Sequence, residues 1–331
     1  MAVYLHTASA RFAKNRQKRT ACALGQAVDL PYFNAFDEPL LSLDQLYGYL
    51  EEQIAQTLEE AGWTEQDFSQ MPILLGSTAY VISDCEARFA QQEPMPSQYS
   101  LAVIAEYLQA RYQTQVFSLA TSCTSSAQAI QTAYKMLKNG LYDKALVVGF
   151  EMFNRLTFEH FFAMNLLSFE EDYQPLVRSN GLVLGEGIGC VALSSQPSDV
   201  PCEILAVEGV TDNLNLTNNS QQALEDLLSQ CLAKANVQAD QITCVKPHGV
   251  GGASDEMEKS LLARFFPKAQ VLALKSQCGH TLGASGAIET ALLLQEIRQN
   301  PPLAEGPCLS YFLGFGGSNV AWILKWGNDD A

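Results

Sequence analysis

One unit of sequence occurs twice in this chain and constrains its fold more than any other feature. A short apolar run is followed by a turn of small and polar residues, which leads into a helical pattern rich in small side chains. The first copy starts at Val116, turns at Cys123 and continues as a helical stripe at Ala127, Ile130, Ala133, Tyr134 and Leu137. The second copy starts at 270–274, turns at His280 and continues as a small-residue helix through Glu289. Small-residue helices suit burial between two sheets, so two related halves are expected.

The rest of the chain alternates between strand-like and helical runs. Strands are expected at 145–150, 202–207 and 242–245, and helices at 222–234 and 256–266. This alternation predicts an α/β fold, with a parallel or mixed sheet and helices on its faces.

Each half is expected to end in a β-hairpin marked by glycines. The first hairpin is predicted at 181–194, with its turn near Gly185. The second is predicted at 308–326, with its turn near Gly314.

One segment of the chain has the composition of a linker. Residues 196–201 combine proline, serine and aspartate between two strand-like runs. We therefore predict two domains, one from 1–196 and one from 197–331. The first carries Cys123, and the second carries His248 and His280.

Bulk composition excludes several classes of protein. A hydrophobic content of 47% and a charged content of 17% are typical of a compact globular chain of 331 residues. No apolar run approaches the roughly 20 residues that span a bilayer, so no membrane insertion is expected. The first residues lack the pattern of a signal peptide. Nine cysteines occur singly, which predicts neither disulfides nor a metal site and favours a cytoplasmic location.

The charge balance bears on the partners. The chain has 36 acidic and 20 basic residues, which argues against nucleic acid and anionic membranes. The single dense basic run spans Arg11 to Arg19 and includes Lys14, Arg16 and Lys18. An acidic partner would have to dock there or on another subunit.

Cys123 stands where a fold can activate a thiol. The unpaired N–H groups and the positive end of the helix dipole at a helix N-terminus favour thiolate over thiol. The alternative is a small buried cysteine on a packed helix.

Two of the four histidines lie among glycines at the mouth of a strand-turn-helix unit. His248 is followed by Gly249, and His280 is preceded by Gly279. Glycine at a strand end allows close approach of a ligand, and α/β proteins place their chemistry at such ends. His6 and His160 lack this setting and are expected to be packing or surface residues.

Five blocks of sequence follow one another along the chain. They are Thr121-Ser-Cys-Thr-Ser-Ser126, Gly181-Leu-Val-Leu-Gly-Glu-Gly-Ile-Gly189, Pro247-His-Gly249, Lys275-Ser-Gln-Cys-Gly-His-Thr-Leu-Gly-Ala-Ser-Gly286 and Gly314-Phe-Gly-Gly-Ser-Asn319. In this order they resemble the signature of the β-ketoacyl-acyl-carrier-protein synthases, condensing enzymes of the thiolase superfamily. The chain is similar to a shortened member of this family, such as a type II polyketide or aryl-polyene ketosynthase or its chain-length-factor partner. The resemblance implies a thiolase-like five-layer αβαβα fold with two pseudo-symmetric halves.

The resemblance also implies an activity, the decarboxylative Claisen condensation of acyl and malonyl thioesters in fatty acid or polyketide chain elongation. In this family a cysteine accepts the acyl group, and Cys123 matches its position. His248 and His280 match the two histidines that stabilise the enolate, and Lys275 and Glu289 match the family lysine and glutamate.

Further implications concern the oxyanion hole, the cofactor and the partners. The backbone N–H groups of Cys123 and Phe315 would form the oxyanion hole, supported by the turn at Gly316 and Gly317. No cofactor is expected, because substrates arrive on the phosphopantetheine arm of an acyl carrier protein. A homodimer, or a heterodimer with another ketosynthase subunit, is expected.

The chain departs from the family after the first histidine. The family shows His-Gly-Thr-Gly-Thr, whose hydroxyls hold the pantetheine arm, and this chain has Val250 and Gly252 in place of the two threonines. Lys246 before the histidine is also unusual.

Three hypotheses therefore remain. The chain is an active ketosynthase, a chain-length-factor partner that shapes the tunnel of another ketosynthase, or a different Cys-His enzyme on the same fold, such as a thiolase or an acyltransferase. Candidate tunnel residues are Phe161, Phe162, Met164 and Leu166.

Overall fold

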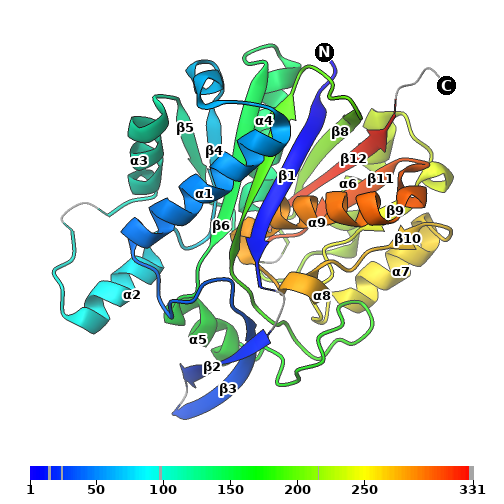
Figure 1. Cartoon of the computed structure of the whole chain (residues 1–331). Helices are drawn as coiled ribbons and strands as arrows, with labels where there is room; N and C mark the ends of the chain where they lie inside the picture. The colour runs from blue at the N-terminus through cyan, green and yellow to red at the C-terminus, as the bar shows by residue number, and fades with distance from the viewer. Residues whose placement is uncertain (14–15, 24, 97–98, 215, 328–331) are drawn as a thin grey trace.

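The computed structural model describes residues 1–13, 16–23, 25–96, 99–214 and 216–327. Ten strands of this part of the chain form one hydrogen-bonded sheet in the order β10-β9-β11-β12-β8-β1-β7-β6-β4-β5 (Figure 1). The strands of the first half are β1 (Tyr4–Phe12), β4 (Ile73–Gly76), β5 (Val116–Leu119), β6 (Lys144–Glu151) and β7 (Gly187–Ser194). Those of the second half are β8 (Cys202–Thr211), β9 (Cys244–Lys246), β10 (Gln270–Val271), β11 (Cys308–Phe312) and β12 (Ser318–Trp326).

The two halves repeat one topology. In the first half the order β5-β4-β6-β7-β1 is parallel between β5, β4 and β6 and antiparallel from β6 to β1. The order β10-β9-β11-β12-β8 in the second half shows the same pairing directions. The halves join where Tyr4 on β1 pairs with Glu203 on β8. The predicted pseudo-symmetry is confirmed.

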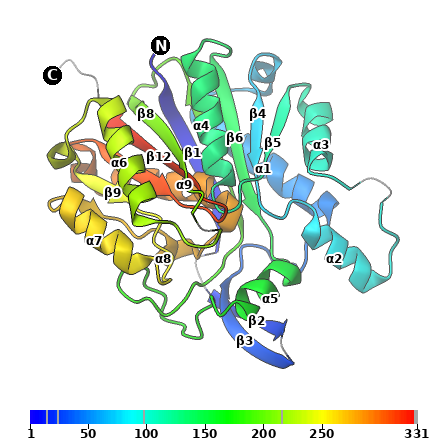
Figure 2. The same ribbon diagram turned by 180° about the vertical axis from the view of Figure 1, so that it is seen from behind.

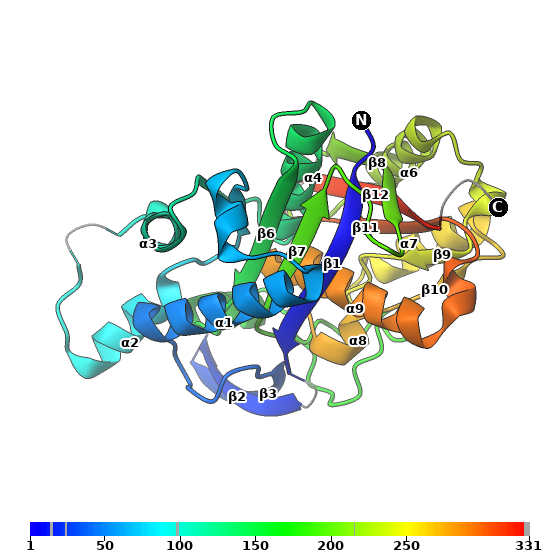
Figure 3. The same ribbon diagram turned by 45° about the horizontal axis from the view of Figure 1, so that its top comes forward.

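Helices and strands alternate in five layers, with helices outside, between and outside the two groups of strands (Figures 2 and 3). One apolar core lies between the first-half strands and α1 and α3, a second between both groups of strands and α4 and α9, and a third between the second-half strands and α6 and α7. The predicted thiolase-like αβαβα arrangement is therefore confirmed. The helices of these layers are α1 (Leu43–Ala61), α3 (Ala102–Tyr112), α4 (Ser125–Lys138), α6 (Gln221–Ala235), α7 (Asp255–Phe265) and α9 (Ser285–Gln299).

The remaining elements lie outside these layers or connect them. A separate two-stranded sheet packs against α5 below the main sheet (Figure 1). None of the helices in the described residues is long and apolar enough to cross a membrane. These elements are β2 (Arg16–Ala23), β3 (Gln26–Phe33), α2 (Ile82–Gln91), α5 (Arg155–Ala163), α8 (Lys275–Cys278) and the 3₁₀ helices η1 (Glu65–Ser69), η2 (Ala239–Gln241), η3 (Leu282–Ala284) and η4 (Pro301–Ala304).

The two central helices cross at very small residues. Ser126 at the start of α4 accepts a hydrogen bond on Oγ from the backbone N–H of Ala287 on α9, at 3.1 Å. A Cβ atom on Gly286 would lie 2.3 Å from the backbone nitrogen of Ala127. This contact explains why both central helices are rich in small residues.

The same crossing makes a prediction about two helical glycines. In an open helix, Gly→Ala is stabilising by up to about 1 kcal/mol. A Cβ added to Gly48 on α1 would have no atom within 4 Å, so Gly48→Ala is expected to raise the free energy of unfolding. Gly286→Ala is expected to lower it by about 1–3 kcal/mol, because the added methyl group overpacks the crossing. Urea denaturation of both variants measures the difference, and a stabilised Gly286→Ala protein would contradict the crossing.

The predicted hairpin at 181–194 is wrong. Only its second part, β7, is a strand, and β7 pairs with β1 and β6. The first part runs beside the second histidine, where Leu184 forms a bridge with His280. A Cβ on Gly185 would lie 2.2 Å from the carbonyl oxygen of Cys278, so this glycine serves close approach and not a hairpin turn.

Other predicted elements are found in the structure. The hairpin at 308–326 is confirmed by the antiparallel pair β11–β12. The strand expected at 270–274 is shorter, with only Gln270–Val271 in β10. The division into domains at 196/197 stays a prediction.

Candidate functional site

Cys123 sits in a tight turn between β5 and α4. The turn requires Ser122 to adopt a left-handed backbone conformation with φ of 54°, which is strained for a residue with a side chain. Ser125 holds the turn, because its Oγ donates to the Ser122 carbonyl at 2.7 Å and accepts from the Thr121 N–H at 3.0 Å. Cys123 is 4% exposed. The predicted strand-to-helix turn is present.

Both predicted histidines converge on this turn. His280 lies between α8 and α9, and its Nε2 is 3.1 Å from the Sγ of Cys123. Its Nδ1 is 3.4 Å from the Oγ of Ser285. His248 follows β9, and its ring stands perpendicular to that of His280 with 5.4 Å between centroids. The structure thus gathers a thiol and two imidazoles from three separate segments.

The other two histidines lie elsewhere. His6 packs on Trp63, with ring centroids 5.1 Å apart. The Nδ1 of His160 lies 2.7 Å from the carbonyl oxygen of Leu156 on its own helix, α5. Neither lines the cavity that contains Cys123.

A buried cluster of two lysines and one glutamate supports the site. Lys275 Nζ lies 2.7 Å from Glu289 Oε1 and donates to the carbonyl oxygen of His248 at 2.7 Å. Lys246 Nζ donates to Glu289 Oε2 at 2.9 Å and to the carbonyl oxygen of Tyr311 at 3.0 Å. All three side chains are about 1% exposed. The cluster therefore holds the backbone of His248 in place through its carbonyl oxygen.

Lys246 was not assigned a role from the sequence. Burial lowers its pKa to about 7, against the attraction of Glu289. Burial would raise the pKa of Glu289, but Lys246 and Lys275 hold it below its usual value. The signal in the sequence was a lysine at the end of a buried strand, Cys244–Lys246.

Further buried carboxylates hold backbone N–H groups around the site. Asp255 accepts from the N–H groups of Val250 and Gly251, and Glu258 accepts from that of Gly249. Glu151 accepts from the N–H of Gly283 in the loop after His280. These acids were missed as functional residues.

Glu186 is another buried carboxylate that holds backbone N–H groups. It accepts hydrogen bonds from the N–H groups of Ala35, Phe36 and Phe153. Burial raises the pKa of Glu151, Glu186 and Glu258 to about 7. The sequence did offer a signal for these buried acids. Each of two stands alone inside an apolar or glycine-rich run, as in Gly149-Phe-Glu151 and Gly185-Glu-Gly187.

The site opens into a cavity of about 400 Å³. Of the predicted tunnel residues, Phe161, Met164 and Leu166 line it. Phe162 packs against Phe169 instead, with centroids 6.4 Å apart. The remaining lining residues are Cys123, Leu182, Thr217, Asn218, Asn219, His248, Val250, Gly252, Ala253, Ser254, His280, Leu313 and Phe315.

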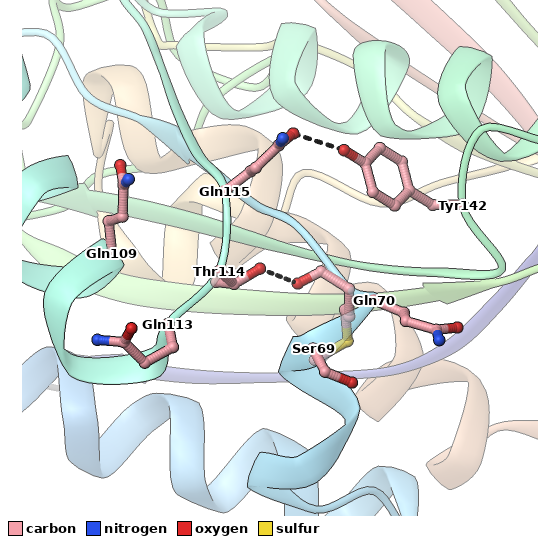
Figure 4. Close-up of a pocket in the computed structure, with 8 residues that line it drawn as sticks. Ser69, Gln70, Gln109, Gln113, Thr114, Gln115 and Tyr142 are labelled. Atoms are coloured by element: carbon pink, nitrogen blue, oxygen red, sulfur yellow. Dashed lines mark hydrogen bonds between the residues drawn. The ribbon is translucent and has the colours of Figure 1, made fainter.

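A second cavity lies where β4, β5 and β6 begin, and Gln70, Gln115 and Tyr142 are among the residues that line it (Figure 4). It has a volume of about 360 Å³ and is lined mostly by glutamine, threonine and serine side chains. Tyr142 donates to Gln115 there at 2.6 Å. None of the predicted site residues lines it, and tyrosine is its one ionisable side chain, so it offers no nucleophile with an adjacent base.

The expected thiolate is not supported by the electrostatics of the site. Burial raises the pKa of Cys123 to about 12, although Lys275 and the N–H groups of Phe315 and Cys123 itself act to lower it. Desolvation outweighs the helix terminus. Burial also lowers the pKa of both His248 and His280 well below the ordinary value, with Lys275 adding to the effect. The resting pair is a neutral thiol beside a neutral imidazole that can accept its proton.

This charge state predicts the pH dependence of Cys123 alkylation. The thiolate fraction of a group with a pKa near 12 rises about tenfold per pH unit below that value. Alkylation of Cys123 by iodoacetamide should therefore climb from pH 7 to pH 10 without levelling off. Peptide mass spectrometry with a free cysteine peptide as control measures it, and a plateau near pH 8 to 9 would show that the thiol ionises normally.

Two family models match this chain over most of its length. A family model described as the β-ketoacyl synthase N-terminal domain matches residues 3–198, and the model of the C-terminal domain matches residues 202–302. The chain belongs to the β-ketoacyl synthase family.

Similar proteins include fungal and bacterial synthases. Lovastatin diketide synthase lovF of Aspergillus terreus is 26% identical over 294 residues, which cover 81% of this chain and 12% of that protein. The 3-oxoacyl-(acyl-carrier-protein) synthase 2 of Rhizobium meliloti (strain 1021) is 24% identical over 326 residues, covering 81% of this chain and 77% of the relative. The chain therefore spans a small part of the first relative and about three quarters of the second.

Among solved structures, a ketosynthase (ApeO) in complex with its chain length factor (ApeC) from Xenorhabdus doucetiae has the same fold. The TM-score is 0.83 at 20% identity, and the match covers 98% of both chains.

The turn at Gly314–Gly317 places Phe315 in the wall of the cavity that contains Cys123. Gly316 and Gly317 have φ of 81° and 74°, and a Cβ on Gly317 would lie 1.7 Å from the carbonyl oxygen of Asp212. The Phe315 ring stacks on Phe161 at 5.9 Å. The backbone N–H groups of Phe315 and Cys123 both act to lower the pKa of the Cys123 thiol. Their role as an oxyanion hole stays a prediction.

Three cations of the basic run at Arg11–Arg19 have acidic or aromatic partners. Arg11 pairs with Glu52 at 2.8 Å, and Lys18 pairs with Glu171 at 3.3 Å. The guanidinium of Arg19 packs over the ring of Phe153 at 4.5 Å. Lys14 lies outside the described residues.

Proposed function

We propose that this chain is a β-ketoacyl synthase subunit that catalyses decarboxylative Claisen condensation of acyl and malonyl thioesters in fatty-acid- or polyketide-type chain elongation. The observation that carries the proposal is the contact of His280 Nε2 with Cys123 Sγ at 3.1 Å, inside a cavity that also holds His248. A candidate nucleophile and its candidate base are thus in contact.

The first step transfers an acyl group to Cys123. His280 accepts the thiol proton as the sulfur attacks the thioester carbonyl, and a new carbon–sulfur bond forms. The N–H groups of Cys123 and Phe315 stabilise the oxyanion. The carbon–sulfur bond to the carrier then breaks, the departing thiolate takes a proton from solvent, and His280 keeps the proton of Cys123.

The second step uses both imidazoles as donors. The malonyl thioester loses carbon dioxide, and the electron pair passes to an enolate whose oxygen accepts hydrogen bonds from His248 and His280. The enolate carbon attacks the acyl carbonyl, the carbon–sulfur bond to Cys123 breaks, and the thiolate regains its proton from His280. Burial and the cation of Lys275 lower the pKa of both histidines, so the imidazoles are uncharged before each cycle.

The proposed partners are an acyl carrier protein, whose phosphopantetheine arm brings the substrates, and a second ketosynthase-type subunit. No separate cofactor enters either step. Strand β5 forms the edge of the sheet, and Phe117 on it is 37% exposed. Pairing of this edge with another subunit would cover it next to the Cys123 turn, as a homodimer or a heterodimer.

Two further proposals concern the location of the protein and its division into domains. A cytoplasmic location is supported by the nine cysteines, all of which are unpaired. A division of the chain into 1–196 and 197–331 is supported by the end of β7 at Ser194 and the start of β8 at Cys202.

A second candidate is a chain-length-factor partner that lines the tunnel of another ketosynthase. Val250 and Gly252 lack the family hydroxyls, and Arg11, Lys18 and Arg19 are paired or stacked. A degradative thiolase is disfavoured, because Cys278 does not line the cavity and its Sγ contacts backbone carbonyls instead.

The test is condensation of acyl and malonyl carrier thioesters by the isolated chain and by its complex with a ketosynthase subunit. As a synthase, the chain should form β-ketoacyl product, and Cys123→Ala should abolish the product. Cys22→Ala, a change at an exposed cysteine, is the matched control. Full activity of a complex that carries Cys123→Ala would instead assign the chain as a chain-length factor.

A further inference from the structure

An unpartnered buried oxygen lies in the wall of the catalytic cavity. Asn219 lines the cavity, and its Oδ1 is shielded from solvent without a hydrogen-bond partner. His248, whose Nδ1 is also unpartnered, is the other lining residue with such an atom among the described residues. A buried polar atom without a partner costs about 1–3 kcal/mol, so a ligand that supplies the missing partner is favoured.

The loop that carries Asn219 is held at both ends. Asp212 accepts the N–H of Ser220 at 2.6 Å, and the backbone N–H of Asp212 donates to Gly317 at 2.8 Å. The N–H of Gly316 donates to Leu216 at 2.7 Å. The loop of Asn219 is thereby held against the Gly314–Gly317 turn, whose Phe315 lines the same cavity as Cys123.

The segment Val250–Gly252, which also lines the cavity, has few free polar groups. Val250 and Gly252 have no hydroxyls, and the N–H groups of Val250 and Gly251 donate to Asp255. The carbonyl oxygen of Val250 accepts from the hydroxyl of Tyr173 at 2.9 Å. A polar chain that enters the cavity therefore cannot be held by these groups.

We propose that Asn219 accepts a hydrogen bond from a secondary amide N–H of the pantetheine arm, in place of the hydroxyls absent at Val250 and Gly252. The inference rests on the proposed function, because it assumes that a pantetheine thioester enters this cavity. Asn219 is a positioning residue in this account, since it contacts the arm and not the reacting carbonyl.

The test compares two thioesters of the same acyl group, acyl-pantetheine and an ethyl thioester that has no amide. Intact-protein mass spectrometry measures the rate of Cys123 acylation by each. One neutral hydrogen bond is worth about 0.5–1.5 kcal/mol, so Asn219→Ala should slow acylation by acyl-pantetheine about twofold to tenfold. The ethyl thioester should react at an unchanged rate.

Three further measurements separate this role from a structural one. Asn219→Asp keeps an acceptor at the same position and should retain most of the preference for acyl-pantetheine. Asn219→Ala should leave thermal stability unchanged or higher, because it removes an unpartnered polar atom. Asn213→Ala, an exposed change on the same loop, should alter neither thioester rate.

Two results would overturn the inference while leaving the proposed function intact: equal slowing of both thioesters, or no change in either, in Asn219→Ala. Failure of the wild-type chain to be acylated by either thioester would instead overturn the proposed function and the inference with it.

Discussion

Glu289→Gln is expected to lower the free energy of unfolding by about 3–5 kcal/mol, because removing one partner of a buried ion pair leaves an uncompensated charge. Here the loss is shared by two lysines, since Lys246 and Lys275 both lie within 3 Å of the Glu289 carboxylate and are about 1% exposed. Glutamine keeps the size of the side chain, so the charge is the main change. Urea denaturation at pH 7 measures the effect.

The pH dependence gives the prediction a sign. Burial lowers the pKa of Lys246 from 10.5 to about 7 in the folded protein, so the unfolded chain binds more protons between these values. Folding stability should therefore rise with pH across that window. In Glu289→Gln the rise should begin at a lower pH, because the carboxylate that favours protonated Lys246 is gone.

Glu296→Gln is the matched control. It lies on the same helix two turns later, and its carboxylate accepts only from the neutral amide of Gln277, at 2.8 Å. Its effect should stay below about 1 kcal/mol. A loss in Glu289→Gln as small as that of the control would show that the buried cluster does not support the fold.

His248→Ala is expected to slow decarboxylation of a malonyl thioester by about 10²–10³-fold, the usual effect of removing one oxyanion donor. Acylation of Cys123 should change far less, because His280 and not His248 contacts the sulfur. Carbon dioxide release and the acyl adduct measure the two steps separately.

His160→Ala provides the control for that experiment. Its ring contacts its own helix, α5, and does not line the cavity, so both steps should proceed at the wild-type rate. A parallel fall of acylation and decarboxylation in His248→Ala would remove the division of labour between the two histidines.

Local patterns predicted the repeated unit of the fold well. The Cys123 and His280 turns each precede a small-residue helix, and these helices form the central layer, where contacts such as that of Gly286 with Ala127 exclude larger side chains. The same patterns placed Cys123, His248 and His280 at strand ends, and the structure brings them together.

Features that depend on tertiary contacts were not predictable in this way. The glycines at 181–189 indicated a hairpin, but Gly185 serves close approach to Cys278. A helix terminus indicated a thiolate, but the degree of burial of Cys123 decides its pKa. Glu151 and Glu258 bind backbone N–H groups of distant or irregular segments, which no periodicity reveals.

The most direct test of this account is the site of acylation. The wild-type chain is incubated with an acyl-pantetheine thioester, and the adduct is located by intact-protein and peptide mass spectrometry. We expect one acyl group per chain, on Cys123 and on none of the other eight cysteines, and no adduct in Cys123→Ala. Acylation spread over several cysteines, or an equal adduct in Cys123→Ala, would contradict the assignment of Cys123 as the nucleophile.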